Sequence, residues 1–131
     1  MAAASAVVGC LAGAARPATT SYDLTRTILF NGKPTFPLVL SPGPPLGSKT
    51  PWGTDGLAET AAAGANVYRS GPGGTWSGSD ISSALAWDRA AAALHVYTWP
   101  NLSGYSQATP GSASDAGLAQ VVGALTSDPS P

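Results

Sequence analysis

The carboxyl groups are the first side chains to consider for acid and base chemistry, and the 131 residues contain seven of them. Two carboxyl groups that face one another across a cleft can serve as general acid and base. In folds of alternating strands and helices, such groups are expected where strands end. None of the seven falls at such a position, and Asp55, Asp80 and Asp115 instead precede predicted helices, where the helix dipole favours a carboxylate. The sequence therefore predicts no catalytic residues.

The single cysteine, Cys10, and the single histidine, His95, offer little further chemistry. A disulfide within the chain needs a second cysteine, and a zinc site needs several more Cys or His ligands. Cys10 lies in an apolar N-terminal stretch, whereas His95 opens a predicted strand at the end away from the expected site. Residues 70–74 are rich in glycine but lack the lysine of a phosphate-binding loop. We expect no metal and no cofactor.

Aromatic and hydrogen-bonding side chains gather at predicted strand ends and in loops. The tryptophan rings can stack on the apolar faces of sugars, and an asparagine can bond a hydroxyl group. The same rings can instead pack loops onto the fold, and an arginine at a strand end can simply be solvated. The candidate substrate-binding residues are Arg69, Trp76, Trp99, Asn101 and Trp52.

The elements that would position these residues begin with a hairpin. Two β-prone runs, residues 26–30 and 35–40, flank Asn31-Gly32, which is a strong signal for a tight turn between strands. Pro34 and Pro37 favour an edge position for the second strand, because proline has no backbone N–H to donate.

Helices and strands then alternate to the end of the chain. A residue that caps a helix stands before each helical stretch, and glycine follows the first one, at Gly64. This order predicts a parallel sheet with right-handed crossovers. We expect strands at 65–69 and 95–99, and helices at 56–63 after Thr54 or Asp55, at 81–93 after Asp80, and through Leu125 after Ser112 or Ser114.

The composition excludes one class of partner. Hydrophobic residues make up 44% of the chain and charged residues only 10%, against about 25% in typical globular proteins. Six Lys and Arg oppose seven Asp and Glu, and no basic stripe is visible. Nucleic-acid binding depends on positive charge along the phosphate backbone, so we expect no nucleic-acid partner.

Residues 1–20 have the features of an export leader. An uncharged run at 2–15 is too short to span a bilayer but fits the apolar core of a signal peptide. No basic residue precedes Arg16, so a disordered alanine-rich leader or a misplaced start codon are the alternatives. Residues 7–10 also resemble a bacterial lipobox, which would make Cys10 the site of a lipid anchor. We expect a secreted or cell-surface bacterial protein without a transmembrane segment, and one domain at 21–131.

Several stretches resemble a known family. Residues 28–37, ILFNGKPTFP, resemble the segment that enters the barrel in glycoside hydrolases of the cellulase and β-galactosidase type. Residues 56–69 are similar to the first helix and second strand of that family, with the valine one place early and Tyr68 before the arginine. Residues 95–101 are similar to its third strand. The resemblance covers about residues 24–128.

The resemblance implies a fold and an activity. The fold would be α/β, a partial (β/α)8 barrel made of the N-terminal hairpin and about three βα units, since a whole barrel takes about 250 residues. The activity would be hydrolysis of O-glycosidic bonds in polysaccharides or glycosides, with the catalytic carboxylates on later strands. Arg69 would match an arginine that orients the nucleophile. The alternative is a non-catalytic carbohydrate-binding or cell-surface module.

Overall fold

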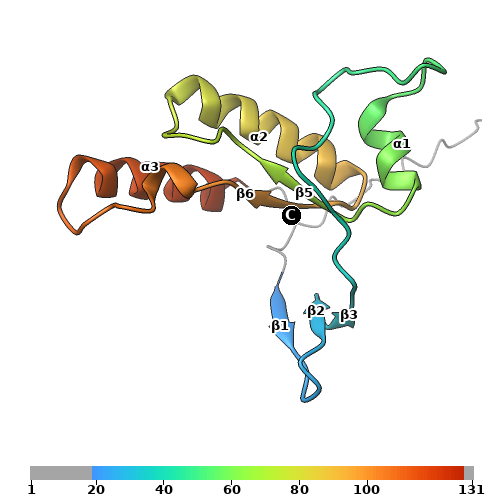
Figure 1. Cartoon of the computed structure of the whole chain (residues 1–131), viewed down its shortest axis with the longest axis horizontal. Helices are drawn as coiled ribbons and strands as arrows, with labels where there is room; N and C mark the ends of the chain where they lie inside the picture. Colours follow the sequence, from blue (N-terminus) through green and yellow to red (C-terminus); the bar gives the residue numbers. More distant parts are fainter. Residues whose placement is uncertain (1–18, 129–131) are drawn as a thin grey trace, which may run out of the picture.

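The computed structural model describes residues 19–128, which form two three-stranded sheets and three α-helices (Figure 1). The antiparallel sheet contains β1 (Thr20–Tyr22), β2 (Ile28–Phe30) and β3 (Lys33–Pro34). The parallel sheet contains β4 (Val39–Leu40), β5 (Val67–Ser70) and β6 (Tyr97–Pro100), in that order. The helices are α1 (Gly56–Ala62), α2 (Gly78–Ala93) and α3 (Ala113–Ser127), with a short 3-10 helix η1 (Ser103–Tyr105) before α3.

The predicted hairpin is confirmed in its turn but not in its second strand. Asn31 and Gly32 both have positive φ, at 50° and 77°, as a tight turn between twisted strands requires. The strand expected at 35–40 is wrong, because β3 covers only Lys33–Pro34 and Val39–Leu40 pairs with β5 in the other sheet. Pro34 and Pro37 explain the early end, since neither can donate to the ladder.

Side chains of the parallel sheet alternate between two faces. The register places Val67 beside Tyr97 and Arg69 beside Trp99. Successive residues of a strand point to opposite faces, so these four side chains share one face, and Tyr68, Ser70 and Thr98 share the other. Helices α1 and α2 lie on the side of the parallel sheet opposite the antiparallel sheet (Figure 1).

Side-chain caps fix the starts of the helices. Asp55 caps α1 by accepting a hydrogen bond from the Ala58 N–H, and Ser112 caps α3, so both predictions that included these residues are confirmed. The expected start of the middle helix is wrong. Ser77 is the N-cap of α2, and Asp80 lies one turn inside, where its carboxylate accepts from the Ser77 N–H. This reciprocal capping box adds three residues to the expected helix.

Both later strands begin two residues after the predicted positions. The N–H groups of Ala65 and Val96 donate back to carbonyl oxygens near the ends of the preceding helices, at Thr60 and Ala91. These backbone groups complete the helix ends and are not free to join a sheet. Strands β5 and β6 therefore start only at Val67 and Tyr97.

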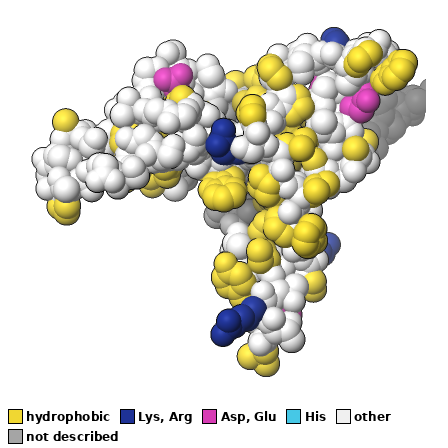
Figure 2. All heavy atoms as spheres, in the orientation of Figure 1, with side chains coloured by type: hydrophobic (Ala, Val, Ile, Leu, Met, Phe, Trp, Pro, Cys, Tyr) yellow, Lys and Arg dark blue, Asp and Glu magenta, His cyan; other side chains and the backbone are white. Residues whose placement is uncertain are grey.

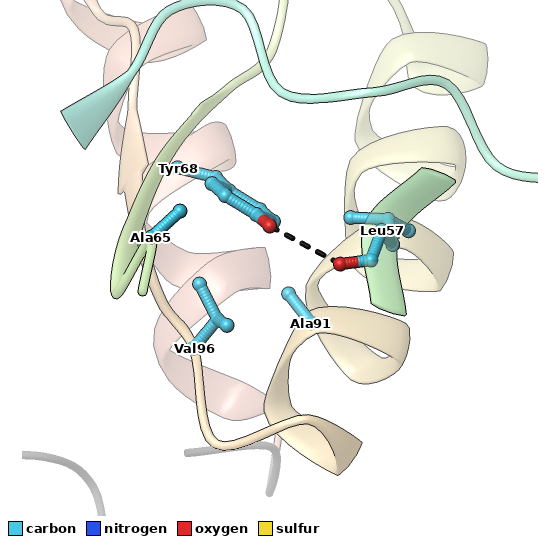
Figure 3. Close-up of a cluster of buried hydrophobic side chains, with 5 residues drawn as sticks. All are labelled: Leu57, Ala65, Tyr68, Ala91 and Val96. Carbon is cyan, nitrogen blue, oxygen red and sulfur yellow. Dashed lines mark hydrogen bonds between the residues drawn. The ribbon is translucent and has the colours of Figure 1, made fainter. Parts of the chain in front are cut away.

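Tyr68 lies at the centre of the core between the parallel sheet and the helices. It is fully buried, and its hydroxyl group donates to the Leu57 carbonyl oxygen at 3.2 Å (Figure 3). The same hydroxyl contacts the Thr60 side chain. The cluster consists of Leu57, Ala65, Tyr68, Ala91 and Val96. One side chain thus joins β5 to both α1 and α2.

The expected fold class, a partial (β/α)8 barrel with an N-terminal hairpin and about three βα units, is wrong for the described residues. A barrel portion needs one continuous, curved parallel sheet. The structure instead has two separate three-stranded sheets and three helices. The parallel strands are only two to four residues long. The N-terminal strands form a sheet of their own, which lies below the parallel sheet in Figure 1.

Candidate functional site

One face of the parallel sheet is only partly covered. At its start, the Phe30 ring packs on Tyr97 with ring centres 4.5 Å apart, and the Asn31 amide donates to the Tyr97 hydroxyl group at 3.1 Å. These contacts place the antiparallel sheet over the beginning of β6. Val39, the first residue of β4, and Trp99, near the end of β6, remain 38% and 61% exposed. Figure 2 shows hydrophobic side chains across the middle of the molecule, with a cationic side chain among them.

A cleft of about 480 Å³ lies at the ends of the three parallel strands. Ligands bind at this end of the strands in open α/β sheets because the loops that leave the strands diverge there. Among the described residues that line the cleft, Arg69 supplies the only charge and Trp99 the largest ring. The lining consists of Val39, Ser41, Arg69, Trp99, Pro100, Asn101, Leu102 and Ser103.

The charge of Arg69 has no partner among the described residues. Its Nε is buried and forms no hydrogen bond. The ion pair seen in residues 19–128 joins Arg89 to Asp128 at 2.6 Å and does not involve Arg69. The side chain lines the strand-end cleft and also a neighbouring cleft of about 290 Å³. A guanidinium has five N–H donors, so Arg69 offers unused donors at this position.

Two hydrogen bonds hold Asn101 in place, two residues after Trp99. Its N–H donates to the Ser70 carbonyl oxygen at 2.9 Å, which extends the β5–β6 pairing by one residue. Its side-chain oxygen accepts from the Ser103 N–H at 3.2 Å and starts η1. The structure therefore brings three of the sequence-predicted residues, Arg69, Trp99 and Asn101, into one cleft.

Trp76 does not line this cleft. Its ring is 9% exposed and packs against Gly71, where a side chain on the glycine would collide with it. Its indole N–H donates to the Asn101 carbonyl oxygen at 2.9 Å, and its backbone N–H donates to the Tyr105 hydroxyl group. Trp76 thus contributes to the cleft indirectly, because its hydrogen bond holds the segment that carries Asn101.

Trp52 also lies apart from the cleft. It belongs to the loop before α1, its side chain is 81% exposed, and it lines none of the described clefts. A surface tryptophan of this kind is available to a ligand, but the other candidate residues do not surround it. Among the predicted tryptophans, only Trp99 combines exposure with the cleft.

Asp88 is a buried carboxyl group on α2. It is 9% exposed, and its Oδ1 has no hydrogen-bond partner, nor has the buried Ser70 Oγ. Burial raises the pKa of Asp88 to about 6, and the nearby hydroxyl groups of Ser70 and Thr98 offset part of this rise, whereas the charge of Asp128 adds to it. The Ser70 side chain also borders the smaller cleft.

The cleft contains polar residues that sequence reasoning missed. Ser41 follows β4, and Ser103 begins η1. The signal for Ser41 is its position directly after a β-prone run, but the Asn31-Gly32 turn favours a hairpin for that run. The position of Ser103 could not be predicted, because a 3-10 helix of three residues is too short to show a periodic pattern in the sequence.

Residues 19–128 hold neither a helix long and apolar enough to cross a membrane nor a cluster of three His, Cys, Asp or Glu side chains suited to a metal ion. The proposed leader and the lipid-anchor site at Cys10 lie outside the described residues. No family model, curated protein or solved structure matches the chain.

Proposed function

We propose that this chain binds a carbohydrate in the cleft at the ends of β4, β5 and β6. The observation that carries the proposal is the exposed Trp99 ring, 61% accessible, on the cleft wall beside the donors of Arg69. A sugar ring presents an apolar face that an indole can cover and hydroxyl groups around its rim that polar side chains can bond.

The other lining groups suit the same kind of ligand. Serines at 41 and 103 and the amide of Asn101 can each donate or accept a hydrogen bond. The backbones of Asn101 and Ser103 are fixed by the sheet and by η1, so little of their conformational entropy is lost when a ligand binds. A small cleft with one aromatic wall and several hydroxyl-binding groups favours one or two sugar units.

The proposal concerns binding, and it is compatible with a place for this chain in a secreted glycoside hydrolase. Hydrolysis requires two carboxyl groups on either side of the scissile bond. The described residues that line the cleft contribute an arginine but no carboxyl group. A hydrolase that used this cleft would need its acid and nucleophile from elsewhere.

The test is a titration of tryptophan fluorescence with soluble gluco- and galacto-oligosaccharides. The protein carries Trp52→Phe, which leaves Trp99 as its exposed indole, since Trp76 and Trp87 are buried or half-buried. We expect a saturable change in emission with at least one sugar. We expect Trp99→Ala to abolish this change, because the stacking surface is lost.

The matched control is Trp52→Ala, which removes an even more exposed tryptophan outside the cleft. Binding measured by calorimetry should survive this change and be lost with Trp99→Ala. Equal affinities in both variants, or no binding of any sugar by the parent protein, would refute the proposal.

A further inference from the structure

The charge of the cleft points to a narrower class of ligand. Arg69 carries the single charge among the eight residues that line the strand-end cleft. The guanidinium lacks a hydrogen-bonded or ion-paired partner within residues 19–128. A cation on a cleft wall is compensated either by water or by an anion that enters the cleft.

The carboxylate that lines a cleft together with Arg69 is Asp80, and it bonds Ser77. In that smaller cleft, Asp80 Oδ2 accepts both from the Ser77 N–H at 2.8 Å and from the Ser77 hydroxyl group at 2.6 Å. These bonds lower the pKa of Asp80 and hold its carboxylate at the start of α2. Asp80 therefore serves the helix cap and leaves the Arg69 charge for another group.

Arg69 and Trp99 are direct neighbours across the β5–β6 pair, on the same face of the sheet. Adjacent strands lie about 4.8 Å apart, so a ligand that covers the indole also comes within reach of the guanidinium. An acidic sugar offers both features, because its anionic group projects from the rim of a ring whose face is apolar. Arginine binds carboxylate and sulfate oxygens through a planar pair of N–H donors.

We infer that the cleft selects anionic saccharides, in which a uronate carboxylate or a sulfate ester is held by Arg69 while the sugar ring lies on Trp99. This inference rests on the proposed function, since it names the substrate class of the same cleft. The Ser41, Asn101 and Ser103 side chains then bond the neutral hydroxyl groups.

The experiment compares three galacto-oligosaccharides of equal length: a neutral one, one with uronate carboxylates and one with sulfate esters. Affinities are measured by fluorescence in the Trp52→Phe protein and by calorimetry. We expect at least one anionic sugar to bind about tenfold more tightly than the neutral one, with an advantage that shrinks at high salt. The two anionic arms identify which anion is preferred.

Variants at Arg69 separate charge from geometry. Arg69→Gln should remove the advantage of the anionic sugar over the neutral one. Arg69→Lys should retain part of that advantage, because lysine keeps the charge but loses the planar pair of N–H donors. Lys33→Gln is the matched control: it removes one positive charge from an exposed strand outside the cleft and should have no effect. Circular dichroism of each variant checks the fold.

The two proposals fail in different ways. Equal affinity for neutral and anionic sugars, with no effect of Arg69→Gln, overturns the preference for anions and leaves carbohydrate binding standing. An anionic advantage that Lys33→Gln reduces as much as Arg69→Gln does also overturns it, since net charge would then be the cause. Absence of binding by all three sugars overturns the proposed function itself.

Discussion

Asp88 is the residue whose chemistry is most altered by the fold. In an unfolded chain its pKa is near 3.8, and burial between α2 and the ends of β5 and β6 raises it to about 6. Between these two values the folded protein binds more protons than the unfolded chain, so the free energy of unfolding decreases as pH rises from about 4 to about 6. Above that window the buried carboxylate is ionised and the full cost remains.

We predict that Asp88→Asn raises the free energy of unfolding at pH 7 by about 1–2 kcal/mol, because the amide has nearly the same shape and carries no charge. Urea denaturation at several pH values from 4 to 8 measures this effect. The gain should vanish near pH 4, where Asp88 is protonated in the folded protein. An equal gain at pH 4 and pH 7 would show that ionisation of Asp88 is not its source.

At the scale of elements, the conformation of the loop between β5 and α2 depends on the close contact between the Gly71 backbone and the Trp76 ring. Gly71 has a φ of 80°, and the Trp76 indole lies against it so closely that a Cβ at this position would overlap the ring. Trp76 in turn belongs to the second core cluster, which joins this loop to α2, η1 and α3 through Ile81, Ala84, Tyr105 and Val121.

Gly71→Ala should therefore destabilise the protein by about 2 kcal/mol or more, through an unfavourable φ and a displaced indole. Gly73→Ala, in the same loop, is the control, because a Cβ there meets open space and its φ is not positive. Thermal denaturation and the maximum of the tryptophan emission report the change. If both substitutions cost the same, loop flexibility and not the contact with Trp76 determines the stability.

The elements also show what the sequence could predict and what it could not. Local signals were sufficient where a few neighbouring residues decide the structure, as in the Asp55 and Ser112 caps and the Asn31-Gly32 turn. They failed where a distant partner decides. Whether Val39 continues the hairpin strand or pairs with β5 depends on a strand about 28 residues later. Pro34 and Pro37 weaken the hairpin pairing but do not identify the other partner.

The residues of the candidate site also differ in whether local signals predict their position. Arg69, Trp99 and Asn101 were recognised because each stands at or near the end of a strand, and strand ends converge in a parallel sheet. Trp76 stands in a loop of similar composition, yet its indole turns inward, since Gly71 leaves room for it. Such space depends on packing between segments, which composition does not encode.

At the scale of the whole molecule, the parallel sheet is small and open. Its order leaves β4 and β6 at the edges, and in the described part of the chain neither outer edge is paired. Unpaired edges of a sheet present rows of N–H and C=O groups to other chains. Exposed apolar side chains lie beside them, Val39 at the β4 edge and Trp99 at the β6 edge.

We therefore predict that the chain self-associates as its concentration rises, because pairing of edges and burial of the apolar face both favour a second copy. Light scattering after size exclusion measures the mean mass at low and high concentration. Val39→Lys should lower that mass, since a charge opposes edge pairing. Leu24→Lys is the control, because Leu24 is fully exposed in the turn between β1 and β2, away from the open edges. A monomer at every concentration, with a sharp and reversible thermal transition, would contradict the prediction.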